Sequence, residues 1–260
     1  MNLARWSLLA LLVLPWACIH IPQVEVASTP PEPLASWNAS SLPWSTAIIW
    51  VERPNGITLT TGVLVDKEKR LVLATRHAVE KPGSPTEMDR IYVVWPDADS
   101  QGEMITTSDH YFQKRRTGNW QPARVLRQDT SRDVVLLEAT LPPPTLSRAV
   151  PLALEHFPAG QALQGVAQPF TRGALWHPFQ ATIQDSTHRR LSYSPADMRQ
   201  PVLLYVAQGQ QPFEFGYSGS PLVHPSTGQL VGLLLAAQLD QPHSYVLISS
   251  QELLQFLPIE

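Results

Sequence analysis

The stretch FGYSGSPLV at residues 215–223 places Ser218 on a tight turn between small residues and then runs directly into an apolar strand. Gly and Ser are common turn residues, and the Pro-Leu-Val run fits the start of a buried strand. A serine presented in this way is either a nucleophile or an ordinary turn residue. The strands on either side, and the side chains they carry, decide between these two interpretations.

The rest of the chain is built from short runs rich in Val, Ile, Leu and Thr, bounded by Gly, Pro, Asn and Asp. The helical period of 3.6 residues is confined to one or two turns in SQELLQFL at 250–257. The 25 prolines agree, because Pro is excluded from helix interiors. The sequence therefore predicts an all-β fold. The clearest strands are AIIWV (47–51), ITLTTGVLV (57–65), RLVLAT (70–75), RIYVVW (90–95), DVVLLEA (133–139), PVLLYVA (201–207), QLVGLLLAA (229–237) and SYVLIS (244–249).

The strands fall into two sets. A break at LPPPTLSRAVP, residues 141–151, separates two segments of roughly a hundred residues each. The simplest architecture is two small barrels within a domain at 46–258, the first over about 46–140 and the second over about 151–250. No internal repeat of fixed period is present, which disfavours propellers and solenoids.

The composition is that of a globular protein, with 43% hydrophobic and 16% charged residues in a chain of 260. The formal net charge is -3, from 19 Lys and Arg against 22 Asp and Glu, without long runs of one sign. Nucleic acid is not an expected partner, because binding a phosphate backbone requires clustered positive charge. The sequence lacks an HExxH motif and paired Cys and His spacing, so neither a metal site nor another cofactor is expected.

The N-terminus has the pattern of an export signal. An arginine precedes an apolar run at residues 6–16, which is too short for an ordinary membrane-spanning helix but suits a secretory signal. Residues 1–18 are therefore predicted to be a signal peptide, and the protein is expected in the periplasm, in the cell envelope or outside the cell. Residues 19–45 are rich in Pro and Ser and lack periodicity, which predicts a linker.

Cys18 is the only cysteine, so an intramolecular disulfide is impossible. A cysteine directly after an apolar signal region is typical of bacterial lipoproteins, in which the acylated thiol tethers the protein to a membrane. The alternative is a soluble exported protein in which Cys18 is removed with the signal or buried. The sequence leaves both interpretations open.

The segment GYSGS at 216–220 comes close to GxSxG, the nucleophile elbow of α/β-hydrolases. That motif requires glycine where Ser220 stands and a helix after the turn, whereas two prolines follow closely here. The turn is therefore not a nucleophile elbow. The pattern that fits is Gly-x-Ser-Gly-x-Pro leading into a strand, with His77 and Asp133 earlier in the chain, each beside an apolar run.

The order His, Asp, Ser is that of chymotrypsin and differs from the orders in subtilisin and the α/β-hydrolases. The sequence resembles the chymotrypsin-like (trypsin-like) serine proteases, and most closely the bacterial HtrA/Deg branch. The resemblance covers most of residues 45–250 and implies two six-stranded Greek-key β-barrels with an active cleft between them. The matching motifs are TTGVLVD (60–66), LVLATRHAV (71–79), RDVVLLEA (132–139), GYSGSPLV (216–223) and GQLVGLLLA (228–236).

The chemistry of such a site explains the residue types. The hydroxyl of Ser218 is a weak nucleophile and needs a base, His77, which would later protonate the leaving amine. Asp133 would hold the imidazole in the correct tautomer and orientation. The N–H groups of Gly216 and Ser218 would form the oxyanion hole, and glycine suits a backbone conformation that side chains resist. The expected activity is that of a serine endopeptidase, acting on protein or peptide substrates through an acyl-enzyme.

Other histidines and aspartates fit these roles less well. Asp129, in the polar segment RQDTSRD, and Asp109 are alternatives to Asp133, but Asp133 alone opens a strand expected to be buried. His224 follows Ser218, in the wrong chain order, which indicates a structural role. The remaining histidines, at positions 20, 110, 156, 177, 188 and 243, are interpreted as surface or core residues.

The resemblance implies that the substrate side chain beside the scissile bond contacts residues just before the nucleophile and on a later strand. These are Pro212, Phe213 and Glu214, followed by Leu235, Ala236, Ala237 and Gln238. Aspartate is absent from this set, which predicts small or medium apolar substrate side chains, with Glu214 leaving a basic one as the alternative. Tyr217 stands where trypsins have Asp and HtrA proteins commonly Asn, and is expected to shape or obstruct the cleft.

Two further expectations concern the C-terminal end of the domain and its insertion, and a third concerns the alternative to an enzyme. Only 42 residues follow Ser218, so the PDZ domain that HtrA proteins normally carry is not expected. The insertion at 103–120 is long for a hairpin loop and either borders the cleft or decorates the first barrel. The alternative to an enzyme is a protease-fold protein without turnover that binds peptide segments at the cell envelope.

Overall fold

The computed structural model of the protein describes residues 41–54, 56–79, 90–118, 120–169, 173, 175–189, 191, 201–238 and 240–257. The predicted signal peptide with Cys18, and the predicted linker up to residue 40, lie outside the described residues. Within the described part of the chain, no helix is long and apolar enough to cross a membrane. Leu42, which the sequence places in the linker, is 2% exposed and packs into the core beside a 3-10 turn at Pro43–Ser45.

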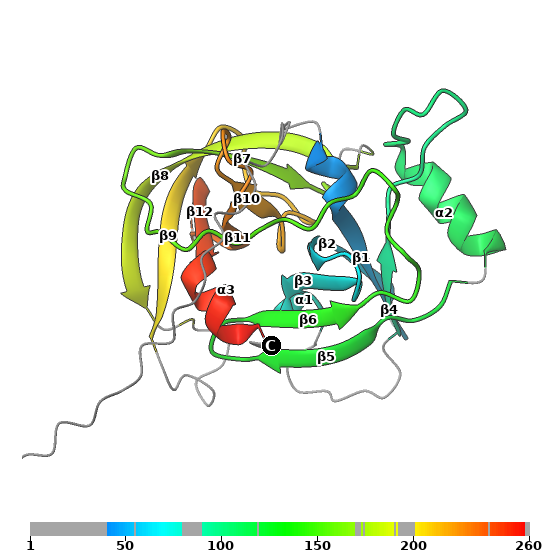
Figure 1. Ribbon diagram of the computed structural model, residues 1–260, viewed down its shortest axis with the longest axis horizontal. Coiled ribbons are helices and arrows are strands. Elements are labelled where there is room, and N and C mark those ends of the chain that lie inside the picture. Colours follow the sequence, from blue (N-terminus) through cyan, green and yellow to red (C-terminus); the bar gives the residue numbers. More distant parts are fainter. Residues whose placement is uncertain are drawn as a thin grey trace, which may run out of the picture. The chain divides into compact units, whose positions relative to one another are not determined.

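The first half of the described chain forms an antiparallel six-stranded sheet (Figure 1). Its strands are β1 (Thr46–Arg53), β2 (Gly56–Asp66), β3 (Leu71–Thr75), β4 (Arg90–Val94), β5 (Arg124–Asp129) and β6 (Val134–Glu138), in the order β4-β1-β2-β3-β6-β5. The edge strands β4 and β5 form no ladder with each other in the described residues. However, the N–H of Ala123, just before β5, donates to the carbonyl of Ile91 on β4 (2.7 Å). The sheet therefore curls into a half-barrel whose edges approach each other, rather than the fully closed barrel that the resemblance implies.

The second half forms a closed antiparallel barrel. Its strands are β7 (Ala162–Ala167), β8 (His177–Arg189), β9 (Val202–Gly209), β10 (Pro221–Val223), β11 (Leu230–Gln238) and β12 (Gln241–Ser249). The order is β10-β11-β12-β9-β8-β7, and the barrel closes where Leu222 of β10 pairs with Gly165 of β7. The prediction of an all-β fold with two six-stranded halves is confirmed.

Strand β11 illustrates why the apolar runs identify strands so clearly. Val231 and Leu234 belong to the interior cluster of the second barrel, whereas Leu233 and Leu235 face the first sheet. All four side chains are 0% exposed. A strand that is buried on both faces is apolar throughout, whereas a strand with one exposed face alternates apolar and polar residues.

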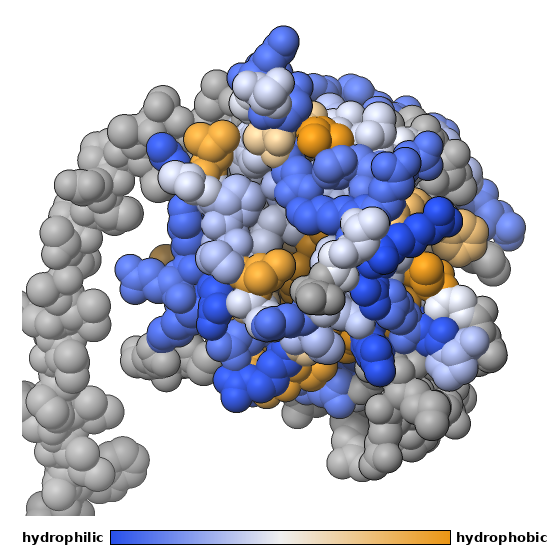
Figure 2. Space-filling model, turned by 90° about the vertical axis from the view of Figure 1, so that its right-hand side faces the viewer, coloured by the Kyte–Doolittle hydropathy of each residue, from blue (hydrophilic) through white to orange (hydrophobic). Residues whose placement is uncertain are grey.

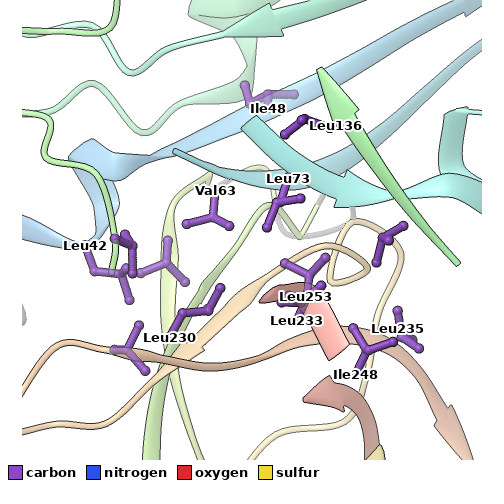
Figure 3. Packing of buried hydrophobic residues seen from close by; sticks show 14 of the residues in the cluster. Leu42, Ile48, Val63, Leu73, Leu136, Leu230, Leu233, Leu235, Ile248 and Leu253 are labelled. Carbon is purple, nitrogen blue, oxygen red and sulfur yellow. The ribbon is translucent and has the colours of Figure 1, made fainter. Parts of the chain in front are cut away.

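The outward face of β11 takes part in a core shared by the two halves. Figure 3 shows this packing, with Ile48, Val63, Leu73 and Leu136 from the first sheet, Leu230, Leu233, Leu235 and Ile248 from the second, and Leu253 from the C-terminal helix. Burying one such side chain contributes about 1.5–3 kcal/mol. The shared core therefore fixes the two sheets against each other, and with them the residues at their boundary.

The helices are short. Helix α1 (Arg76–Val79) follows β3, α2 (Ser108–Thr117) lies within the insertion, and α3 (Ser250–Phe256) confirms the helical turns predicted near the C-terminus. Helix α2 contacts the first sheet, because Arg115 donates hydrogen bonds of 2.6 and 2.8 Å to Glu52 on β1. Figure 1 shows α2 beside β4, and Thr106 and Ser108 of the insertion also bond to Leu175 and Gly173, so the insertion contacts both the first sheet and the segment that leads into β8. The face on this side is largely hydrophilic, with scattered apolar side chains (Figure 2).

Candidate active site

The pairing of β3 with β6 brings His77 next to Asp133. Thr75, the last residue of β3, lies opposite Val134, the first of β6, so the residues just beyond each strand meet at one end of the sheet. The N–H of His77 donates to Oδ1 of Asp133 (2.9 Å), and the N–H of Arg76 donates to its carbonyl (2.9 Å). Nδ1 of His77 lies 2.5 Å from Oδ2 of Asp133.

Asp133 is 2% exposed and has a left-handed backbone conformation, with φ 55°. Asp tolerates this conformation better than most residues with side chains. Its carboxylate accepts from both the backbone and the ring of His77, so it sets the ring orientation. With Nδ1–H donating to the carboxylate, the Nε2 lone pair of a neutral imidazole points away from Asp133.

Ser218 comes from the second barrel and meets His77 from the other side. Its Oγ lies 3.2 Å from Nε2 of His77, across a separation of 141 residues in the chain. The same hydroxyl lies 3.0 Å from the carbonyl oxygen of Leu235 on β11. The structure thus brings Asp133, His77 and Ser218 together as a continuous series of hydrogen bonds that crosses the boundary between the two sheets.

Two glycines shape the turn that presents Ser218. Gly216 and Gly219 have φ values of 96° and 80°. The N–H of Tyr217 donates to the carbonyl of Glu214 (3.1 Å), and a positive φ at the residue before the donor is the mark of a type II turn. A Cβ at Gly219 would lie 1.9 Å from the carbonyl oxygen of Thr61, so only glycine fits there.

Two threonines of β2 attach this turn to the first sheet. The N–H of Thr61 donates to the carbonyl of Ser218 (3.0 Å), and the Thr60 hydroxyl donates to the same carbonyl. The Thr61 hydroxyl donates to the carbonyl of Gly216 (2.8 Å). Both threonines lie in the TTGVLVD motif of the resemblance, but neither was predicted to be a site residue. Adjacent hydroxyls on a strand expected to be buried were the available signal.

The predicted oxyanion hole consists of backbone groups on the same turn. In the described part of the chain, the N–H groups of Gly216 and Ser218 donate to no protein acceptor. Gly216 is buried and lies two residues before Ser218 on the same turn. The two donors are therefore available to an oxygen that becomes negatively charged at this position.

The predicted substrate contacts lie around the turn and at the end of β11. Pro212 is exposed, whereas Phe213, Glu214, Ala236 and Ala237 are half-buried. Phe215, which was not among the predicted contacts, is 84% exposed and directly precedes Gly216. An apolar ring that is left exposed beside a candidate nucleophile is available for contact with a bound peptide.

Tyr217 does not lie in the cleft, and the expectation that it shapes or obstructs substrate binding is wrong. Its side chain is 0% exposed and points into the second barrel. Its ring centroid lies 5.1 Å from that of Phe179 and 5.9 Å from that of Phe213, and its hydroxyl donates to Oε1 of Gln211 (3.2 Å). The physical reason is that the barrel interior offers an aromatic pocket with a hydrogen-bond acceptor, which suits a buried tyrosine.

Asp129, Asp109 and His224 lie elsewhere, and two of them have other partners. Asp129 pairs with Arg132 (2.7 Å), Asp109 lies in the first turn of α2, and Nδ1 of His224 lies 3.0 Å from Oγ of Ser226. None of these contacts reaches Ser218. Among the residues that the structure describes, no group of three or more His, Cys, Asp or Glu could hold a metal ion.

Two six-stranded antiparallel halves with a serine, a histidine and a buried aspartate at their boundary define a protein of the chymotrypsin-like class. Over residues 60–233 the chain matches the family model of the trypsin-like peptidase domain, and it belongs to that family. The resemblance to trypsin-like proteases is therefore confirmed.

Solved structures with a similar fold include three proteases. The active form of Rv3671c protease from M. tuberculosis has a TM-score of 0.61 at 18% identity, over 85% of this chain and 86% of that one. The HtrA-type protease AlgW, with a tripeptide, has a TM-score of 0.58 at 15% identity, over 84% of this chain and 60% of that one. Deg5 has a TM-score of 0.57 at 15% identity, over 83% and 88%. At these identities the likeness concerns the fold alone. No curated protein matches the chain.

Proposed function

We propose that this protein is an exported serine endopeptidase that cleaves peptide bonds through Ser218, His77 and Asp133. The observation that carries the proposal is the position of His77, whose two ring nitrogens lie 2.5 Å from Asp133 and 3.2 Å from Ser218. A base held in this way can take the hydroxyl proton as Oγ attacks a carbonyl carbon. The same imidazole then gives that proton to the leaving amine, which produces an acyl-enzyme.

The remaining groups would act on the oxygen of the attacked carbonyl. The N–H groups of Gly216 and Ser218 would stabilise its negative charge in the tetrahedral intermediate, and losing one such donor generally costs about 3 kcal/mol of barrier. Water then attacks the acyl-enzyme, with His77 again as the base, and releases the second product. Protein or peptide segments are the proposed substrates.

Export is part of the proposal and rests on the sequence of residues 1–18. The proposed location is the periplasm, the cell envelope or the outside of the cell. Acylation of Cys18 would add a membrane tether, and metabolic labelling with a fatty acid, compared between wild type and Cys18→Ser, tests that part by itself.

Fluorophosphonate labelling of the purified protein tests the catalytic proposal, with casein degradation followed in parallel. We expect labelling of wild type and its loss in Ser218→Ala and His77→Ala, since removing either group typically lowers the rate by about 10⁴- to 10⁶-fold. Ser226→Ala, which replaces an exposed serine beyond β10, is the matched control and should label normally. A wild-type protein that is folded by circular dichroism but neither labelled nor active would contradict the proposal and favour a peptide-binding protein without turnover.

A further inference from the structure

The turn between β5 and β6, which ends at Asp133, is shaped by the side chain of Asp129. Oδ1 of Asp129 accepts hydrogen bonds from the N–H groups of Ser131 (2.8 Å) and Arg132 (3.1 Å). Both contacts lie within the turn, so they give it a defined shape without fixing it against the second half of the molecule.

Arg132, directly before Asp133, connects this turn to the C-terminal helix α3, which lies beside it in Figure 1. Its Nε donates to Oε2 of Glu252 (3.0 Å), and its Nη2 donates to Oε1 of Gln255 (2.7 Å). Its Nη1 donates to Oδ2 of Asp129 (2.7 Å). A guanidinium that donates to three acceptors is held in one position, because its N–H groups form a rigid fork.

Glu252 fixes the other end of this connection to the second barrel. The residue is 8% exposed, and its second oxygen, Oε1, accepts from the N–H of Leu203 on β9 (3.0 Å). A carboxylate that is buried to this degree needs donors for its oxygens, which Arg132 and Leu203 supply. Glu252 therefore joins the turn before Asp133 to a strand of the second barrel.

Asp133 is thus held from two sides. The N–H groups of Arg76 and His77 bind it from α1, and Arg132 connects it to α3 and β9. Its left-handed backbone conformation, with φ 55°, is one that surrounding contacts have to maintain. Releasing Arg132 would therefore free the Asp133 carboxylate to move relative to the ring of His77.

We propose that Glu252 is a positioning residue, which acts through Arg132 to hold the Asp133 carboxylate against Nδ1 of His77. This inference rests on the proposed peptidase function and assigns a residue of the C-terminal helix to it. Displacing a reacting group by about 1 Å can cost about a hundredfold in rate. Because the effect is on the orientation of His77 rather than on substrate contacts, losing Glu252 should lower kcat and leave KM nearly unchanged.

The test compares Glu252→Gln, Arg132→Met and the double variant in steady-state kinetics with a peptide substrate. Active sites are titrated with the fluorophosphonate, so that a lower folded fraction does not affect kcat. Glu252→Gln leaves one oxygen for the Leu203 N–H and turns an amide donor toward Arg132, so it should lower kcat by about ten- to a hundredfold. The double variant should lose no more than the more impaired single variant, because the two residues act as one unit.

Two further variants separate positioning from general stability. Glu52→Gln is the matched control, because Glu52 also binds an arginine, but it does so between β1 and α2, and this variant should keep the wild-type kcat. Gln255→Ala removes one contact of Arg132 from an exposed residue and should show a smaller loss of kcat than Glu252→Gln.

Proton NMR gives a readout that does not depend on turnover. The Nδ1–H proton of His77 is deshielded by its hydrogen bond to Asp133 (2.5 Å). Its signal should shift or broaden in Glu252→Gln and stay unchanged in Glu52→Gln.

The outcomes separate this inference from the function on which it rests. Wild-type kcat in Glu252→Gln, or in Gln255→Ala where Glu252→Gln does not fold, overturns the positioning role and leaves the peptidase intact. A double variant whose loss equals the product of the two single losses does the same. A folded wild type that is neither labelled nor active overturns both.

Discussion

The hydroxyl of Thr61, on β2 of the first sheet, donates a hydrogen bond to the carbonyl of Gly216, on the turn that carries Ser218 (2.8 Å). Thr61 is 0% exposed, and its hydroxyl also accepts from the N–H of Gln168 (3.1 Å). Ser220 adds one more contact, because its hydroxyl lies 3.3 Å from that of Thr61. One buried hydroxyl therefore links the first sheet to the backbone of the candidate oxyanion hole.

Thr61→Val should lower kcat by about ten- to a hundredfold and leave KM little changed. Valine has the same shape but leaves the Gly216 carbonyl and the Gln168 N–H unpaired, which costs about 1–3 kcal/mol of stability for each buried group. Steady-state kinetics with a peptide substrate and urea denaturation measure the two effects. Thr61→Ser keeps the hydroxyl and should recover most of the activity. Equal losses in both variants would show that the methyl group, rather than the hydrogen bond, matters.

Asp133→Asn should retain the fold and lower kcat/KM at neutral pH by about 10⁴-fold, the effect seen when the equivalent carboxylate of a serine protease triad is replaced. Asn accepts the left-handed backbone, but its amide would donate to Nδ1 of His77 and thereby stabilise the wrong tautomer. The rate of fluorophosphonate labelling and the melting temperature report on catalysis and fold. Asp129→Asn, at the alternative aspartate, should label at close to the wild-type rate. The reverse pattern would transfer the role of Asp133 to Asp129.

Gly219→Ala should abolish activity and strongly destabilise the protein. A Cβ at this position would overlap the Thr61 carbonyl at 1.9 Å, and φ is 80°. Gly160→Ala is the matched control, because Gly160 also has a positive φ of 88° but nothing within 4 Å of the added Cβ. Gly160→Ala should lower the free energy of unfolding by only about 1–2 kcal/mol, the cost of an alanine in a left-handed conformation. Similar losses in urea denaturation of the two variants would argue against a close contact between the turn and β2.

Acid should weaken the attachment of α2 to the first sheet. Hydrogen bonds from the Arg115 guanidinium lower the pKa of Glu52, against the raising effect of burial. Because the folded pKa lies below the unfolded value of about 4.3, this stabilisation is complete above that pH and is lost as the pH falls through the folded pKa. Glu52→Gln should therefore lower the free energy of unfolding at pH 7 by about 1 kcal/mol.

Urea denaturation of wild type and Glu52→Gln at pH 7 and pH 3 measures this effect. The difference between the two proteins should shrink at pH 3, where protonation weakens the ion pair in wild type as well. Glu68→Gln, at an exposed glutamate on the β2–β3 turn, should follow the wild-type curve at both pH values. A difference between wild type and Glu52→Gln that stays constant with pH would exclude ionisation of Glu52 as its source.

Strands made of continuous apolar runs were predictable from the sequence, and strands with many exposed polar residues were not. All eight quoted runs, from AIIWV to SYVLIS, coincide with strands. The missed strands include β5, a largely exposed edge strand, and β8, whose buried residues are confined to the first half of its 13 positions. Helix α2 was missed because Tyr111 is its only buried residue, so it has no apolar stripe of helical period.

The residues of the candidate site were predictable from their order and motifs, but the direction of side chains on the turn was not. Tyr217 and Phe215 are neighbours of Gly216, yet one is fully buried and the other is 84% exposed. Their orientations depend on how the turn is attached to β2 and to β12, which are distant in the sequence. Thr61 escaped notice for the same reason, since its partners lie more than a hundred residues away.

The division of the site between two sheets has a consequence for biosynthesis. A ribosome delivers His77 and Asp133 with the first sheet, whereas Ser218 appears later, with the second barrel. A nascent chain that has not yet reached the second barrel therefore contains His77 and Asp133 without Ser218. If Ser218 is the nucleophile that we propose, the protein gains its peptidase activity only when both sheets have formed and docked.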